Sequence, residues 1–103
     1  MISSVFYRKD KQFYAFEVRD HADFAESGKD IVCAAVSSAV QLTVNLLDAF
    51  GCRTKTAAVG CLVRCFTNAE YDSASKIIKQ LILHLDSIAE EFPETIKITI
   101  SEV

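Results

Sequence analysis

The segment from Glu70 to Phe92 carries the pattern that most constrains how this chain can fold. Apolar side chains recur there at helical spacing and charged side chains take the opposite face, which is typical of an amphipathic helix packed on a core. The apolar set is Ala74, Ile77, Ile78, Leu81, Leu85, Ile88 and Phe92. Pro93 ends the helix, because proline lacks the amide hydrogen for the next helical bond. The isoleucines that alternate with polar residues over 96–100 then predict a strand with one buried face.

Two hairpins complete the predicted sheet, one at the N-terminus and one in the middle of the chain. Their segments are rich in aromatic and β-branched residues, and Gly60 marks the bend of the second hairpin. The four strands are Ile2 to Tyr7, Gln12 to Val18, Arg53 to Val59 and Cys61 to Thr67. With two helices the order is ββαββαβ, which predicts an α+β fold with a mostly antiparallel five-stranded sheet. We expect one domain over residues 1–103.

The first helix is expected from Ile31 to Phe50, with Asp30 as its N-cap and Gly51 as its C-terminal stop. Its apolar residues fall on nearly every face, so we expect it to be heavily buried. A chain of 103 residues has little material to cover both sides of such a helix, which predicts a homodimer. The run 31–47 is too polar and slightly short for a membrane span, so no membrane is expected.

The composition indicates which cellular environment and which classes of partner to expect. The net charge of −3 comes without a basic cluster, which disfavours nucleic acid and leaves a basic protein or peptide open as a partner. The N-terminus lacks the basic start and apolar run of a signal peptide, so a cytoplasmic protein is expected. The four cysteines are then expected to be thiols. Cys61 and Cys65 lack the close pair typical of zinc sites, so we expect packing roles, no metal and no cofactor.

A histidine and a cysteine frame the segment with the clearest chemistry. His21 lies twelve positions before Cys33, and between them Gly28 and several charged residues indicate a mobile loop. Cys33 would then lie in the first turn of the helix, where unpaired amides and the helix dipole favour thiolate over thiol. The pair could act as nucleophile and acid/base. Taken alone, a cysteine such as Cys33 is more often a small buried hydrophobic residue, and the loop and the helix start bring the two interpretations level.

The segment DHADFAESGKDIVCAAVS resembles the signature of the Prp family, the ribosomal-processing cysteine proteases of bacteria. The family pattern is Gly-His-Ala, a short loop with a glycine, and then Asp-Ile-Val-Cys-Ala-Ala-x-Ser. The matching residues are His21, Ala22, Gly28, Asp30, Ile31, Val32, Cys33, Ala34, Ala35 and Ser37. The resemblance extends over the whole chain in length and in element order.

The resemblance implies a cysteine endopeptidase that removes a short N-terminal extension from a large-subunit ribosomal protein, the twenty-seventh of the conventional series. It implies that His21 and Cys33 are the catalytic pair and that the protein is a homodimer active in bacterial ribosome biogenesis. It also implies a mobile loop over about Ala22 to Lys29, with Gly28 as its hinge. Substrates of the family are similar in having aromatic residues before the cleaved bond and a small residue after it.

Three residues near the pair are candidates for supporting roles. Asp20 stands where the family pattern has glycine, and it could either restrict the backbone or favour the protonated form of His21. Asp30 could cap the helix, orient His21, or do both. Ser37 lies one turn beyond Cys33 on the same helix face and could line the site. The backbone amides at the helix start, including that of Cys33, could bind an oxyanion.

Two other classes of function remain open from the sequence. A non-enzymatic ribosome-assembly or interaction module would use the first helix for dimerisation and Cys33 only for packing. A thiol redox sensor would oxidise Cys33 to a sulfenic acid, which a second cysteine would resolve.

Overall fold

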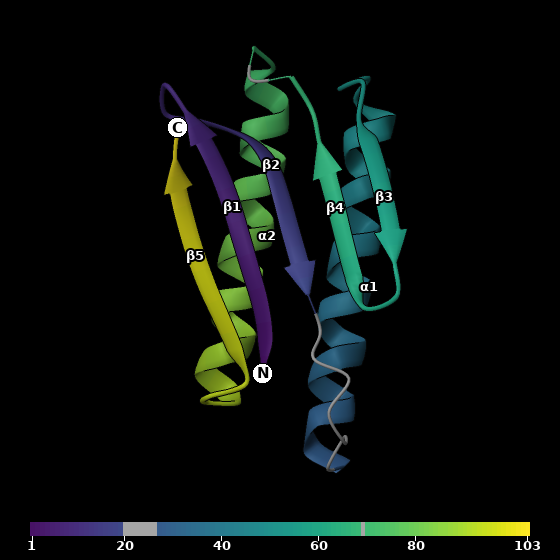
Figure 1. The fold of residues 1–103 in the computed structure, drawn as a ribbon, viewed down its shortest axis with the longest axis vertical. Helices are drawn as coiled ribbons and strands as arrows, with labels where there is room; N and C mark the ends of the chain where they lie inside the picture. The colour runs from purple at the N-terminus through teal and green to yellow at the C-terminus, as the bar shows by residue number, and fades with distance from the viewer. Residues whose placement is uncertain (20–26, 69) are drawn as a thin grey trace.

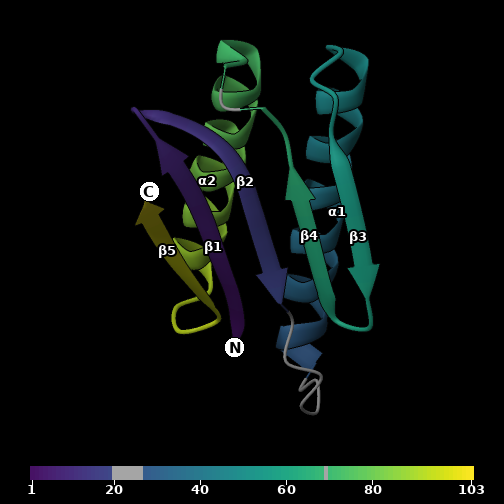
Figure 2. The same cartoon turned by 45° about the horizontal axis from the view of Figure 1, so that its top comes forward.

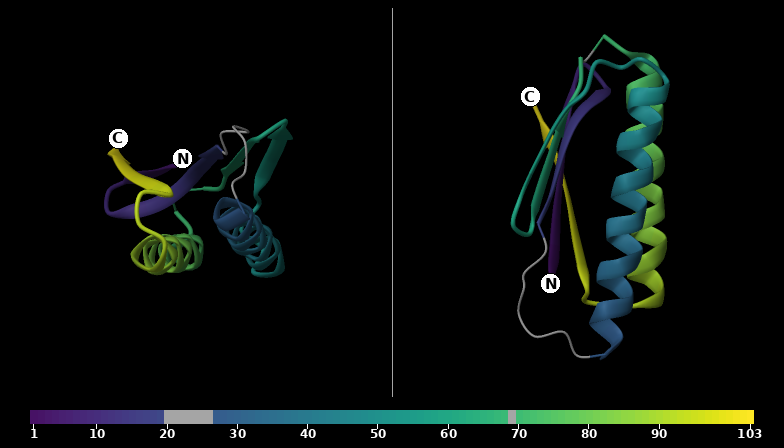
Figure 3. Two further views of the ribbon diagram at one scale, coloured as in Figure 1. Left: turned by 90° about the horizontal axis from the view of Figure 1, so that it is seen from below. Right: turned by 90° about the vertical axis from the view of Figure 1, so that its right-hand side faces the viewer.

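The computed structural model describes residues 1–19, 27–68 and 70–103, which form a five-stranded sheet covered on one face by two helices (Figures 1 and 3). The order ββαββαβ is the predicted one. The elements are β1 (Ile2–Lys9), β2 (Gln12–Arg19), α1 (Ser27–Ala49), β3 (Lys55–Val59), β4 (Leu62–Phe66), α2 (Asp72–Glu91) and β5 (Ile96–Glu102).

The strands lie in the order β3-β4-β2-β1-β5. All neighbours are antiparallel except β1 and β5, which pair in parallel with Ile2 beside Ile96. The predicted α+β fold with a mostly antiparallel sheet is therefore confirmed. The helix α2 is the crossover that the parallel arrangement requires, because the chain must return from β4 to the far edge of the sheet. The hairpin of β3 and β4 lies over α1, whereas β1 and β5 lie over α2 (Figures 1 and 2).

Three turns show why the elements end where they do. Asp10 and Lys11 both have positive φ, so the first hairpin closes in a two-residue turn and β1 runs on to Lys9, further than predicted. Gly60 has φ +57° in the second hairpin, as its place at the predicted bend suggested. Gly51 has φ +69° after α1, and its amide donates to the carbonyl of Asp48. This is the glycine C-cap that the sequence predicts.

The core lies between the sheet and the helices. Phe6 and Phe16 are fully buried side by side on β1 and β2, with ring centroids 6.0 Å apart. From α2, Ile78 and Leu85 are fully buried against them in the same cluster. The predicted apolar face of α2 is confirmed, because its remaining members are buried or packed against this cluster. The buried amide of Phe13 donates a hydrogen bond of 3.0 Å to Ser75 Oγ, which fastens α2 to β2.

The helix α1 is only partly buried, which corrects the expectation of a heavily buried helix. Val32, Val36 and Val40 face the core, whereas Ile31 and Leu42 are 60% and 59% exposed. Apolar residues on every face indicated that the helix is covered all round, but one sheet can cover only one face.

The segment Ile31–Ala49 has the length and composition of a helix that could cross a membrane, with a hydropathy of 1.5. This differs from the expectation that the segment is too short and too polar. Core helices of soluble proteins have the same composition, and α1 packs on the sheet through its valines. The observation alone is therefore weak evidence of a membrane span.

Candidate active site

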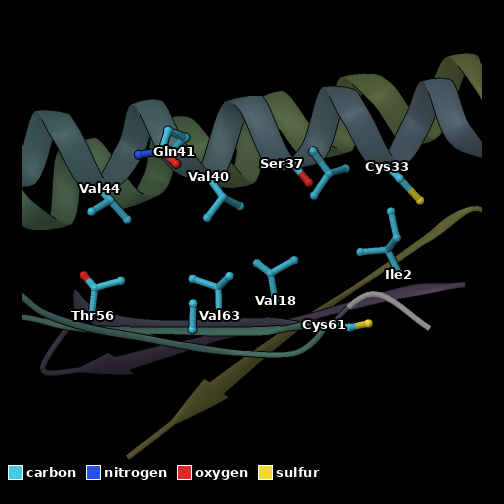
Figure 4. Close-up of a pocket in the computed structure, with 12 residues that line it drawn as sticks. Ile2, Val18, Cys33, Ser37, Val40, Gln41, Val44, Thr56, Cys61 and Val63 are labelled. Atoms are coloured by element: carbon cyan, nitrogen blue, oxygen red, sulfur yellow. The ribbon is translucent and has the colours of Figure 1, made fainter. Parts of the chain in front are cut away.

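Cys33 lies in the second turn of α1, as the seventh residue of the helix. Its side chain is half-buried and packs against the edge of the core. The thiol lies at one end of a pocket between α1 and the sheet (Figure 4). A half-buried thiol beside an open pocket can meet a substrate, whereas a fully buried packing cysteine cannot.

The predicted start of α1 is wrong by four residues, because the helix begins at Ser27 and not at Ile31. Asp30 is therefore inside the helix and is not the N-cap. Gly28 is also helical rather than part of a loop, and residues 27–29 do not belong to the loop expected over about 22–29. The sequence signal was ambiguous because an acidic residue is favourable both at the cap and within the first turn.

The longer helix changes the electrostatics expected at Cys33. The dipole effect falls off within the first turn, and the unpaired amides belong to that turn. Cys33 lies beyond it, so its own amide is not among the helix-start donors that could bind an oxyanion. The helix start therefore stabilises a thiolate at Cys33 less than the sequence analysis expected.

His21 and Asp20 lie outside the described residues. One described residue before them and one after them line the same pocket. These are Val18, near the end of β2, and Cys33 in α1. Ser37 follows one turn after Cys33 and lines the same pocket, as predicted for a residue on the same helix face. Figure 4 shows the Ser37 hydroxyl turned toward the space between α1 and the sheet.

Cys61 is a pocket residue that the sequence did not indicate. It lies in the turn between β3 and β4, is exposed, and lines the pocket at the same end as Cys33 (Figure 4). The packing role expected for it is wrong, whereas Cys65 is buried as expected and Cys52 is buried as well. The sequence assigned Cys61 to a strand, but only the pairing of the sheet brings this end of the hairpin to the same end of the pocket as Cys33.

The buried thiol of Cys65 differs from the two thiols at the pocket. Burial raises the pKa of Cys65, although a hydrogen bond from Thr56 Oγ1 acts in the opposite direction. This thiol is therefore held protonated and inert. Within the described parts of the chain, no group of three or more His, Cys, Asp or Glu residues could hold a metal ion.

Comparison with known proteins assigns the family. The family model described as cysteine protease Prp matches residues 1–97. The chain belongs to the cysteine protease Prp family. A stretch of 36 residues is 50% identical to the ribosomal processing cysteine protease Prp of Bacillus subtilis, and it covers 35% of this chain and 32% of that protein. By family, the chain is thus a cysteine protease.

Solved structures resemble this Prp-family chain over its full length. The protein SMU.848 of Streptococcus mutans has a TM-score of 0.87 at 27% identity, with 100% of this chain and 99% of that chain covered. An essential ribosomal processing protease Prp from S. aureus, in complex with a covalently linked product peptide, has a TM-score of 0.86 at 25% identity, with 98% and 100% covered. The same S. aureus protease with a substrate peptide has a TM-score of 0.88 at 24% identity, again with 98% and 100% covered, and supports the fold.

Proposed function

We propose that this chain is an endopeptidase that removes a short N-terminal extension from a large-subunit ribosomal protein, the twenty-seventh of the conventional series. Cys33 is the nucleophile and His21 is the acid/base. The observation that carries the proposal is the position of Cys33, half-buried at one end of an apolar pocket, in a chain of the cysteine protease Prp family. The S. aureus relative with a covalently linked product peptide supports it further.

The proposed reaction has two steps. The Cys33 sulfur attacks the carbonyl carbon of the peptide bond, and the C–N bond breaks as His21 gives its proton to the leaving amine. The N-terminal fragment is then held on Cys33 as a thioester. Water attacks this thioester, gives a proton to His21 and releases the fragment as a carboxylic acid, which restores the thiolate.

In this scheme, protonated His21 must stabilise the Cys33 thiolate more than it would if Cys33 lay at the helix start. A thiol is only a few per cent ionised at neutral pH, and the dipole of α1 acts mainly on the turn before Cys33. The remaining interaction that favours ionisation in this scheme is an ion pair between the Cys33 thiolate and protonated His21. Ser37 lines the pocket beside the nucleophile, and Asp20 and Asp30 are retained as candidates for orienting His21.

Cleavage of an extended ribosomal protein, followed by mass spectrometry, tests the proposal. Wild-type protein should release a single N-terminal fragment, and Cys33→Ala and His21→Ala should release none. Cys61→Ala is the matched control, because it removes the second thiol at the same pocket and should leave cleavage intact. Equal cleavage by wild type and Cys33→Ala would rule the proposal out.

We also propose that the chain is a homodimer. The outer faces of α1 and α2 support this, because Leu42 and Leu83 are 59% and 53% exposed and line one groove between the two helices. Leu42→Glu should shift the mass measured by analytical ultracentrifugation from dimer to monomer. Val59→Glu, at an exposed apolar residue of β3, should leave the dimer unchanged. A monomeric wild type would contradict this proposal.

A further inference from the structure

Both helices cover the same face of the sheet, and the described residues place no helix on the opposite face (Figure 3). Residues directly opposite each other in paired strands point to the same face, and successive residues of a strand alternate between faces. Phe6 and Phe16 are opposite each other and are buried under the helices. The open face therefore consists of three rows of paired residues that cross all five strands, at Ser3, Val5 and Tyr7 of β1.

Basic side chains gather on this open face. Four of them lie in the three rows, one on each of β2, β3, β4 and β5, and all four are exposed; they are Arg19, Lys55, Arg64 and Lys97. Glu17 is the one acidic residue in these rows. Positive charge therefore predominates on the open face, although the chain as a whole has a net charge of −3.

The basic residues of the open face are far apart along the chain, so the sequence shows no basic cluster and disfavours nucleic acid on that ground. Strand pairing brings them onto one surface. The Arg64 Nε lies 3.3 Å from the Glu17 Oε1 in an ion pair. The other three, Arg19, Lys55 and Lys97, form no ion pair with another described residue. They are therefore available to an anionic partner.

Two aromatic side chains lie among these charges. Phe66 and Tyr7 are in one row, on either side of Ala15, and Phe66 is 44% exposed. Ala15 is only 1% exposed although it does not belong to the core cluster, so neighbouring side chains on the open face cover it. Lys55 is next to Phe66 in the same row. Aromatic rings beside basic side chains can stack unpaired bases while the basic groups contact phosphates.

We propose that the open face of the sheet binds single-stranded RNA, with phosphates on its exposed basic residues and bases stacked on Phe66 and Tyr7. This role does not depend on proteolysis, because Cys33 lies on the helix-covered side of the sheet. A duplex fits less well, since its bases are already stacked on one another. Thr99 and Ser101 of β5 also lie on the open face, and their hydroxyl groups can bond to the 2′-hydroxyl that distinguishes RNA from DNA.

Charge and shape distinguish RNA from two protein occupants of the open face. A second copy of the chain would bring two predominantly basic surfaces together, which electrostatic repulsion disfavours. An acidic protein would satisfy Lys55 and Lys97, but its carboxylates have no flat apolar group to stack on Phe66. A nucleotide supplies both the anion and the flat ring, so it matches the two features of the surface at once.

The first test measures the binding of a fluorescein-labelled oligouridylate of about eight nucleotides by fluorescence anisotropy at several salt concentrations. The logarithm of the binding constant should fall with the logarithm of the salt concentration at a slope of about −2, since three basic residues contact phosphates of a single strand. Lys55→Gln and Lys97→Gln should each make this slope shallower by about 0.7. Lys79→Gln, at an exposed lysine of α2, is the matched control and should leave the slope unchanged. No binding at low salt, or equal effects of Lys79→Gln and Lys97→Gln, would overturn the proposal.

The second test separates base stacking from charge. Phe66→Leu keeps an apolar side chain but removes the ring, so it should weaken oligouridylate binding by about fivefold or more at an unchanged salt slope. Phe66→Tyr should retain the wild-type affinity. An abasic oligonucleotide with the same phosphates should bind wild type more weakly than the oligouridylate does, and should bind wild type and Phe66→Leu equally.

Three competitors identify the occupant of the open face. Oligodeoxyuridylate and duplex RNA should each displace the labelled oligouridylate less well than unlabelled oligouridylate does. Polyglutamate should displace it least, because it has charge but no bases. Displacement by polyglutamate at the concentration at which oligouridylate acts would assign the surface to an acidic protein and overturn the proposal. Equal displacement by the DNA strand or by the duplex would likewise overturn the assignment to single-stranded RNA.

Discussion

Replacing Gly28 by alanine tests where α1 begins, and with it the placement of Cys33 in the second turn. Gly28 lies inside the helix, where alanine is the better helix former by about 0.8–1.0 kcal/mol in an interior position. Gly28 is in the first turn, so we expect a gain nearer 0.5 kcal/mol in the free energy of unfolding. If Gly28 were instead a loop hinge at positive φ, alanine would destabilise the protein by about 1–2 kcal/mol.

Gly60→Ala is the matched control for the sign of this effect. Gly60 has φ +57° in the turn between β3 and β4, and among the described residues other than Gly60 and its two chain neighbours no heavy atom lies within 4 Å of an added Cβ. The change therefore adds backbone strain without a steric clash, and should cost about 1 kcal/mol after the lower entropy of the unfolded chain is included. The two glycine variants should thus shift stability in opposite directions.

Urea unfolding followed by circular dichroism, at one fixed protein concentration, measures both changes. For a domain of this size, 0.5 kcal/mol corresponds to about 2–4 °C in Tm, so a thermal melt should agree. A loss of stability in Gly28→Ala comparable with that of Gly60→Ala would refute the helical assignment of Gly28. Cys33 would then lie closer to the helix start, within reach of its dipole and unpaired amides.

Two further predictions concern α2. A hydrogen bond with Lys76 holds the pKa of the Asp72 carboxyl below its usual value. The ionised carboxylate therefore stabilises the folded state, and this stabilisation is lost as the pH falls through the lowered pKa. Asp72→Asn should therefore lower the free energy of unfolding at pH 7 and leave it unchanged in strong acid. Asp86→Asn makes the same change in net charge and is the control. A loss of stability in Asp72→Asn that does not depend on pH would contradict this prediction. Leu85 is fully buried, so Leu85→Ala should cost about 2–5 kcal/mol in urea unfolding, whereas Val59→Ala, at 75% exposure and outside the proposed dimer groove, should cost little. Similar costs for the two variants would contradict the assignment of Leu85 to the core.

Much of the fold follows from local patterns. The apolar spacing and Pro93 predict α2 to within two residues of its start and one of its end. Gly51 and Gly60 take the positive φ angles expected at a helix stop and a hairpin bend. These signals succeed because each depends on the chemistry of a few neighbouring residues. Nothing distant is needed to interpret them.

The errors concern features that depend on distant partners. Exposure of Ile31 and Leu42 could not be predicted, because an apolar helix face looks the same whether it meets the sheet or another subunit. Cys61 joins the pocket of Cys33 only through the pairing of β3 with β4 and of β4 with β2. The start of α1 was missed because Gly28 and its charged neighbours are compatible with either a loop or a first turn.

The candidate site was predicted in part. The resemblance and the spacing singled out Cys33 and Ser37, and the structure brings both to one pocket. Asp30 and Gly28 were assigned to the wrong side of the helix start. The residues that line the pocket beside Cys33 could not be predicted, since its walls come from α1, β1, β2, β3, β4 and the turn at Cys61, and only their packing creates the space.

The role of Cys33 as the nucleophile can be tested by following activity and Cys33 modification in the same sample. Wild-type protein is treated with iodoacetamide for increasing times, and the modified fraction of each cysteine and the remaining cleavage of the extended ribosomal protein are measured. Activity should equal the unmodified fraction of Cys33 and reach zero when Cys33 is fully modified, whatever the state of Cys61. Cleavage that persists after complete modification of Cys33 would contradict its role as the nucleophile.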